Sequence, residues 1–186
     1  MRPRHLLIFL FGSVLSQAGL GADLAGTRGI WLGNADGEKQ RIGLVEFTAA
    51  ENGKTRFRIT MEEKLEEYFL AMRPFRCLTG PSQRLCHFPV ELEAPVISAG
   101  DLVPLEYALM FMRTPPKSLH INPFNGIYYK MTWTERGIVG QLHDVDMDPF
   151  IAPDSVPLER RLRPLRSVDL SLGDPRSHWL PILTIE

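Results

Sequence analysis

Residues 125–147, NGIYYKMTWTERGIVGQLHDVDM, mostly alternate between large apolar and polar side chains around a Glu-Arg-Gly turn. A period of two is typical of a β-strand, because its successive side chains point to opposite faces. One predicted face carries Ile127, Tyr129, Met131 and Trp133, and the other carries Tyr128, Lys130, Thr132 and Thr134. The stretch therefore predicts an antiparallel hairpin with one face against a hydrophobic core.

Other parts of the chain also have strand character. The segments are residues 29–33, 41–49, 55–61 and the apolar stretch 178–186. Asn52-Gly53, between the second and third of these, is a strong hairpin-turn signal. We therefore expect an antiparallel meander early in the chain and a further strand near residue 186.

Two segments change to helical spacing. In residues 62–72, apolar side chains recur every three or four positions among glutamates, which predicts a short amphipathic helix ended by Pro74. Residues 101–113 predict a second helix, with Asp101 as its N-terminal cap. The apolar content of this second segment also permits a buried strand.

These patterns predict a mostly β fold. We expect an antiparallel meander that forms a small barrel or a strongly bent sheet, with one or two short helices. The composition agrees, because 44% of the residues are apolar and 23% are charged, as in ordinary globular domains. We expect a single β-rich domain over 23–186, with a Pro- and Arg-rich C-terminal extension from about 149.

The first 22 residues have the three parts of a secretory signal peptide. Arg2 and Arg4 make a basic start, an apolar run follows over 6–15, and small residues lead to Ala22. The run is too short for a transmembrane helix, which needs about 20 apolar residues. We therefore expect a periplasmic or secreted protein with no transmembrane segment in the mature chain; a retained N-terminal anchor is the alternative.

The only two cysteines, Cys77 and Cys86, flank the turn-forming stretch LTGPSQRL. An exported compartment oxidises thiols, so the spacing predicts a structural disulfide across the turn. On the chain-entropy model, closing a loop of about ten residues stabilises the fold by about 2.7 kcal/mol. The alternatives are free thiols, a redox pair and a metal clip, although the spacing is not C-x-x-C and only His87 lies nearby as a further ligand.

The stretch HDVDMD contains the strongest candidate for a polar site. Its members are His143, Asp144, Asp146 and Asp148. Alternating aspartates could hold calcium, but Pro149 stands where an EF-hand loop needs glycine. His143 could instead act as a general base oriented by a carboxylate. An acidic strand end in solvent is the simpler interpretation, so we assign no catalytic residue, metal ligand or cofactor.

Several aromatic side chains are candidates for lining a ligand cavity. They are Tyr107, Phe111, Tyr129 and Trp133. Aromatic residues dominate small-molecule pockets, but they fill ordinary cores as well. Both possibilities stay open at this point.

Two resemblances bear on the fold. Gly29-Ile30-Trp31 resembles the G-x-W motif of lipocalin-type barrels. The combination of FLAMRPFRC, LEYALMF and NGIYYKM is similar to a group of exported bacterial proteins of uncharacterised function. The second resemblance implies a secreted β-rich domain and has no catalytic residues to carry over.

The function that these features predict is binding without catalysis. Removing residues 1–22 lowers the formal net charge from −1 to −3, and no long basic run exists, so nucleic acid is not an expected partner. We expect an exported domain that binds an envelope protein or a small apolar ligand. The alternative is a hydrolase that uses His143 with Asp144 or Asp146.

Overall fold

In a computed structural model, the described residues form one antiparallel sheet of 12 strands and one short α-helix. The structure describes residues 25–70, 73–88, 94–118, 125–146, 165 and 167–186. The strands are β1 (Gly26–Gly33), β2 (Lys39–Ala49), β3 (Thr55–Met61), β4 (Glu66–Leu70), β5 (Arg73–Thr79), β6 (Arg84–His87), β7 (Val96–Ile97), β8 (Phe111–Thr114), β9 (Gly126–Thr134), β10 (Gly137–Val145), β11 (Leu170–Leu172) and β12 (Ile182–Ile185). The helices are α1 (Val103–Ala108) and the 3-10 turns η1 (Glu51–Gly53) and η3 (Ser167–Asp169).

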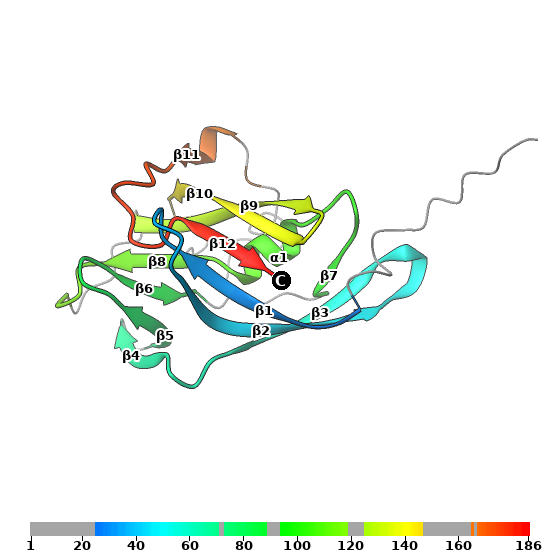
Figure 1. Ribbon diagram of the computed structural model, residues 1–186, viewed down its shortest axis with the longest axis horizontal. Coiled ribbons are helices and arrows are strands. Elements are labelled where there is room, and N and C mark those ends of the chain that lie inside the picture. The colour runs from blue at the N-terminus through cyan, green and yellow to red at the C-terminus, as the bar shows by residue number, and fades with distance from the viewer. Residues whose placement is uncertain (1–24, 71–72, 89–93, 119–124, 147–164, 166) are drawn as a thin grey trace, which may run out of the picture.

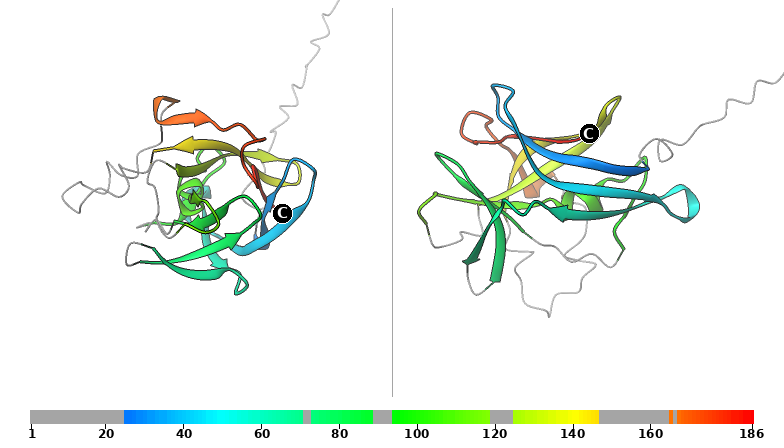
Figure 2. Two further views of the ribbon diagram at one scale, coloured as in Figure 1. Left: turned by 90° about the vertical axis from the view of Figure 1, so that its left-hand side faces the viewer. Right: turned by 60° about the horizontal axis from the view of Figure 1, so that its bottom comes forward.

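The sheet is strongly bent and does not close. Its strands follow the order β4-β5-β6-β8-β9-β10-β12-β1-β2-β3-β7, with β11 beside β10. Figures 1 and 2 show β9 and β10 curving over the interior on one side, while β1, β2 and β3 lie on the other. The mostly β prediction is therefore confirmed in its bent-sheet form, and the described strands do not form a closed barrel.

The β9–β10 hairpin forms as its alternating pattern predicts. Ile138 lies opposite Trp133 and Leu142 opposite Tyr129, which places their side chains on the face that lines the main core. Gly137 turns the chain with φ +135°, a backbone region that favours glycine. A side chain there would collide with the carbonyl oxygen of Ile185, so this turn also requires the absence of a Cβ.

The β12 strand lies in the middle of the sheet. It pairs with β1 on one edge and with β10 on the other, so Ile185 is opposite both Ile30 and Ile138. All three side chains are buried in the main core. The strand expected over 178–186 is thus confirmed, and it joins the β1–β2–β3 part of the sheet to the β8–β9–β10 part.

The helix expected over 62–72 is wrong. The chain makes a turn in which the Leu65 N–H donates to the Glu62 carbonyl at 3.2 Å, and it then becomes β4. Pairing with β5 brings Thr79 to Glu66, which accepts a hydrogen bond from its hydroxyl at 3.0 Å and another from Tyr68 of β4 itself at 2.8 Å. Tertiary contacts have overridden a local spacing that favoured a helix.

The second helix prediction is right only for its first half. Residues 103–108 form α1, with Asp101 accepting the Val103 N–H at 3.0 Å. The chain then extends into β8, which matches the strand alternative for this segment. The apolar segment predicted as one helix therefore contains α1 in its first half and the start of β8 in its second.

The sheet has buried side chains on both faces. Its concave face encloses the main core, to which strands from β1 to β12 and the apolar side of α1 contribute. On the opposite face, a second cluster surrounds the Cys77–Cys86 disulfide, whose two half-cystines are fully buried on β5 and β6. Phe75 and Phe88 pack beside it, with ring centroids 6.4 Å apart. The two-sided burial fixes β5, β6 and β8 firmly against the remainder of the fold.

Helix α1 lies against one end strand of the sheet and one inner strand. It contacts both β7 and β9, although these strands do not pair with each other. Along β9, only Gly126 and Ile127 pair with β8, because the chain before β8 is helical. The rest of this edge of β9 therefore faces α1, and that contact forms the candidate site.

Candidate functional site

Glu106 is a buried carboxylate on α1 with its two oxygens aimed at β9. The Met131 N–H donates to its Oε1 at 2.6 Å, and the Tyr128 hydroxyl donates to its Oε2. The residue is only 5% exposed. Glu106 thus provides the acceptor that a neighbouring strand would otherwise offer to the Met131 N–H.

A pocket of about 400 Å³ lies directly beside this carboxylate. We call it the α1–β9 pocket. Its lining residues are Ala99, Gly100, Asp101, Leu102, Val103, Glu106, Tyr128, Lys130, Met131, Thr132, Trp133, Leu165 and Leu170. Three parts of the chain meet here: the segment before and within α1, the strand β9, and the segment that ends in β11. The pocket thus combines a mostly apolar wall with a few polar groups, as small-molecule sites do.

Burial governs the electrostatics of this pocket. Desolvation raises the pKa of the Glu106 carboxyl, while hydrogen bonds from Tyr128 and Met131 and the charge of Lys130 act in the opposite direction. Burial, followed by the hydrogen bond to Glu106, raises the pKa of the Tyr128 hydroxyl far above its usual range. Tyr128 is therefore a hydrogen-bond donor to Glu106 at any physiological pH.

The aromatic candidates separate into core residues and one pocket residue. Phe111 and Tyr129 meet edge to face in the main core at 6.2 Å, and Tyr107 meets Tyr128 in the same manner at 6.1 Å. Trp133 lines the α1–β9 pocket, and its indole N–H donates to the Ala99 carbonyl at 3.0 Å. Trp133 is the member of the predicted set that faces a described pocket.

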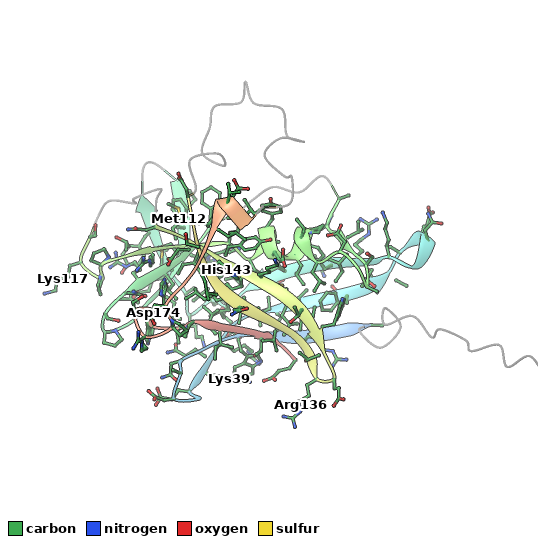
Figure 3. All side chains as sticks on the ribbon, turned by 90° about the horizontal axis from the view of Figure 1, so that it is seen from above. Lys39, Met112, Lys117, Arg136, His143 and Asp174 are labelled. Carbon is green, nitrogen blue, oxygen red and sulfur yellow. A yellow bond between two sulfur atoms is a disulfide. The ribbon has the colours of Figure 1, made fainter. Side chains whose placement is uncertain are left out.

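The acidic stretch does not converge on one site. His143 and Asp144 are neighbours on β10, so their side chains point to opposite faces of the sheet. The His143 ring lies 3.0 Å from the Gln141 carbonyl of its own strand, and Figure 3 shows His143 on β10, apart from Asp174. Asp146 follows the end of β10 and is exposed, and Asp148 lies outside the described residues.

Asp144 pairs instead with a histidine that is distant in sequence. The His178 Nε2 lies 3.0 Å from Asp144 Oδ1, and an Arg113 guanidinium nitrogen lies 3.4 Å from the same oxygen. The other ring nitrogen of His178 lies 2.9 Å from the Asp174 carbonyl and 3.1 Å from the Ser177 hydroxyl. Serine, histidine and aspartate thus form a chain of contacts, but the Ser177 hydroxyl also bonds the Asp174 carbonyl at 3.0 Å, as in a local turn.

Sequence reasoning missed both Glu106 and His178. Glu106 had one visible signal, because it is the only charged residue in the stretch LVPLEYALMF, 102–111. A lone acid within an apolar segment that becomes buried needs hydrogen-bond donors, and the fold supplies two. His178 had no comparable signal, since its partner is 34 positions away.

A second depression of about 410 Å³ lies at the β9–β10 turn. Its charged lining side chains are exposed, and two of them, Lys39 and Glu186, form an ion pair at 3.1 Å. Lys39 and Arg136 mark this end of the molecule in Figure 3. Its buried polar group is the Thr184 hydroxyl, which carries no charge, whereas the α1–β9 pocket has the Glu106 carboxyl and is therefore the stronger candidate.

Across the described ranges, no three His, Cys, Asp or Glu side chains cluster closely enough to hold a metal ion. No helix in this part of the chain has the length and apolar character needed to cross a bilayer. Comparisons of the chain with protein-family models, with curated proteins and with solved structures find no match in any of the three.

Proposed function

We propose that this chain is an exported, non-catalytic domain that binds a small apolar ligand in the α1–β9 pocket. The observation that carries the proposal is the pocket itself, whose apolar wall includes Trp133, Met131 and Leu170 beside the buried Glu106. Small-molecule sites are concave and mostly apolar, with a few placed polar groups that orient the ligand. The resemblance to exported β-rich proteins and the signal-peptide pattern support the same class.

A neutral, environment-sensitive dye such as N-phenyl-1-naphthylamine tests the pocket. We expect saturable binding with one dye per chain, read as a rise in dye fluorescence. The variant Leu170→Trp places a large ring in the pocket and should abolish binding. The matched control is Leu172→Trp on the same strand, because Leu172 is 69% exposed and is not part of the pocket lining.

Two results would contradict this proposal. If neither variant alters dye binding, the dye does not occupy this pocket. If the dye does not bind at all, while an envelope protein co-purifies with the chain and is lost in Leu172→Trp, partner binding at the exposed surface replaces ligand binding. Mass spectrometry of molecules retained from an envelope extract would then identify the natural ligand or partner.

Export has its own test. The basic start, short apolar run and small residues support removal of about the first 18 to 22 residues. N-terminal sequencing of the chain recovered from the cell envelope should begin between residues 19 and 23. An intact Met1 on membrane-bound material would contradict export with cleavage and favour a retained anchor.

Hydrolysis remains a second prediction with a weaker basis. This alternative uses His143 with Asp144 or Asp146, and the His143 and Asp144 side chains lie on opposite faces of β10. Turnover of a chromogenic ester that is lost in His143→Ala would support hydrolysis by this pair. Turnover that is lost in Ser177→Ala instead would assign the activity to the His178 contacts.

A further inference from the structure

The α1–β9 pocket contains a buried carboxylate without a matching cation. Glu106 receives hydrogen bonds from two neutral donors, the Met131 N–H and the Tyr128 hydroxyl. Among the described residues, no ion pair involves Glu106. Buried carboxylates are ordinarily paired with a positive charge or bound to a metal, because desolvation of the ionised form costs several kcal/mol.

The charges around the pocket leave it negative. Two carboxylates, Asp101 and Glu106, line it together with one ammonium, that of Lys130. Lys130 is exposed and does not reach within salt-bridge distance of either acid. When both acids are ionised, the lining therefore has a formal charge of −1, located partly on a group that is shielded from water.

Glu106 also has unused acceptor capacity. A carboxylate can accept about four hydrogen bonds, and the described residues supply two. Glu106 lines the pocket, so an N–H donor bound there could reach the remaining lone pairs. Tyr128 and Trp133 both line the pocket, and the aromatic surface of such side chains attracts cations.

We infer that the ligand of this pocket is a protonated amine with an apolar body. The ammonium donates to Glu106, and Asp101 at the rim adds a second negative charge. The apolar body lies against Trp133, Met131 and Leu170. The inference rests on the proposed ligand-binding function and names its chemical class.

The same arrangement links binding to pH. Burial raises the pKa of Glu106, and an ammonium beside it would lower that pKa, so the amine binds the ionised form preferentially. The groups that face Glu106 are Tyr128 and Lys130 from β9 and Asp101 from the segment before α1. Amine affinity should therefore increase as the pH rises from about 5 to 8, while the affinity of a neutral ligand stays constant.

The experiment compares three probes with the same eight-carbon chain: octylamine, 1-octanol and octanoate. Each probe displaces N-phenyl-1-naphthylamine, so all are measured at one site. We expect octylamine to bind at least about tenfold more tightly than 1-octanol at pH 7.5, since hydrogen bonds to charged groups are worth more than neutral ones. Octanoate should bind most weakly of the three.

The variant Glu106→Gln keeps the shape of the side chain and an acceptor oxygen for the Met131 N–H. It should reduce octylamine affinity to that of 1-octanol and remove the pH dependence. Glu135→Gln at the β9–β10 turn is the matched control, because Glu135 is exposed and does not line this pocket. Circular dichroism and thermal melting verify that both variants are folded.

Each remaining outcome has a distinct meaning. Equal affinity for octylamine and 1-octanol would overturn the amine inference and leave the proposed apolar ligand in place. Preference for octanoate would overturn it in favour of Lys130 as the determinant of the ligand head group. If none of the three probes displaces the dye and the dye itself does not bind, the proposed function has failed and the inference fails with it.

Discussion

His178 and Asp144 join the segment before β12 to the middle of the sheet. The histidine Nε2 lies 3.0 Å from Asp144 Oδ1, with side chains that are 2% and 30% exposed. Asp144 also faces the Arg113 guanidinium at 3.4 Å on β8. Three elements that are separate in sequence are therefore held together by one carboxylate at the edge of the main core.

Replacing His178 by alanine should lower the free energy of unfolding by about 2 kcal/mol, because a buried ring and a hydrogen bond to a charged group are both lost. Urea denaturation followed by circular dichroism measures this value. The control is His143→Ala on β10, whose ring contacts only the carbonyl of its own strand among the described contacts, and which should change stability by less than about 0.5 kcal/mol. Equal losses in the two variants would show that the Asp144 contact contributes nothing.

Removing the disulfide should destabilise the domain without changing its fold. Cys77 and Cys86 lie directly opposite each other on β5 and β6, with Cα atoms 4.0 Å apart. The double variant Cys77→Ala/Cys86→Ala should lose about 2 to 4 kcal/mol, chiefly because its unfolded chain is less constrained. Urea midpoints of the variant and of reduced wild type should agree. Two alkylated thiols in unreduced wild-type protein from the envelope would refute the bond.

The partly buried His87 should make the fold sensitive to mild acid. Its Nε2 donates to the Ala108 carbonyl at 2.7 Å, and burial lowers the pKa of the ring below its ordinary value of 6.5. The unfolded state then binds more protons below pH 6.5, so stability is complete above this pH and decreases as the pH falls towards the pKa of the folded state. His87→Gln retains a donor for Ala108 and should show a smaller loss between pH 7 and 5. If wild type and His87→Gln lose the same stability between pH 7 and 5, His87 is not the group responsible.

Glu106 should make stability depend on pH in the opposite direction. Burial raises its pKa above the ordinary value of 4.5, so its contribution to stability is complete below pH 4.5 and is lost as the pH rises through the pKa of the folded state. Relative to Glu106→Gln, wild type should therefore become progressively less stable as the pH rises from about 4.5. Urea denaturation of both proteins across this range measures the difference. A difference that does not change with pH would show that Glu106 has the same pKa in both states.

The sequence identifies those parts of the fold that depend on local patterns. The β9–β10 hairpin and the β2–β3 hairpin around Asn52-Gly53 are predicted because alternation and turn residues act over a few positions. The 62–72 segment misleads for the same reason. Its local spacing favours a helix, and its strand form depends on β5, which the pattern of 62–72 does not contain.

The candidate site was harder to predict because it depends on contacts between distant segments. Trp133 was named as a ligand-lining candidate, and it does line the α1–β9 pocket. Glu106 was not named, since its importance arises from an edge of β9 that lacks a neighbouring strand. The Asp144–His178 contact likewise requires β10 and the segment before β12 to be placed together, which no short motif encodes.

The central position of β12 determines when this protein can fold. Strand β1 is made first and lies between β2 and β12, so one of its edges stays without a partner until residue 185 has been synthesised. Pairings between strands so far apart in sequence form slowly, because the entropy cost of closing a long loop comes before any stabilising contact forms. The part of the nascent chain that forms this sheet therefore stays incompletely folded until β12 has emerged.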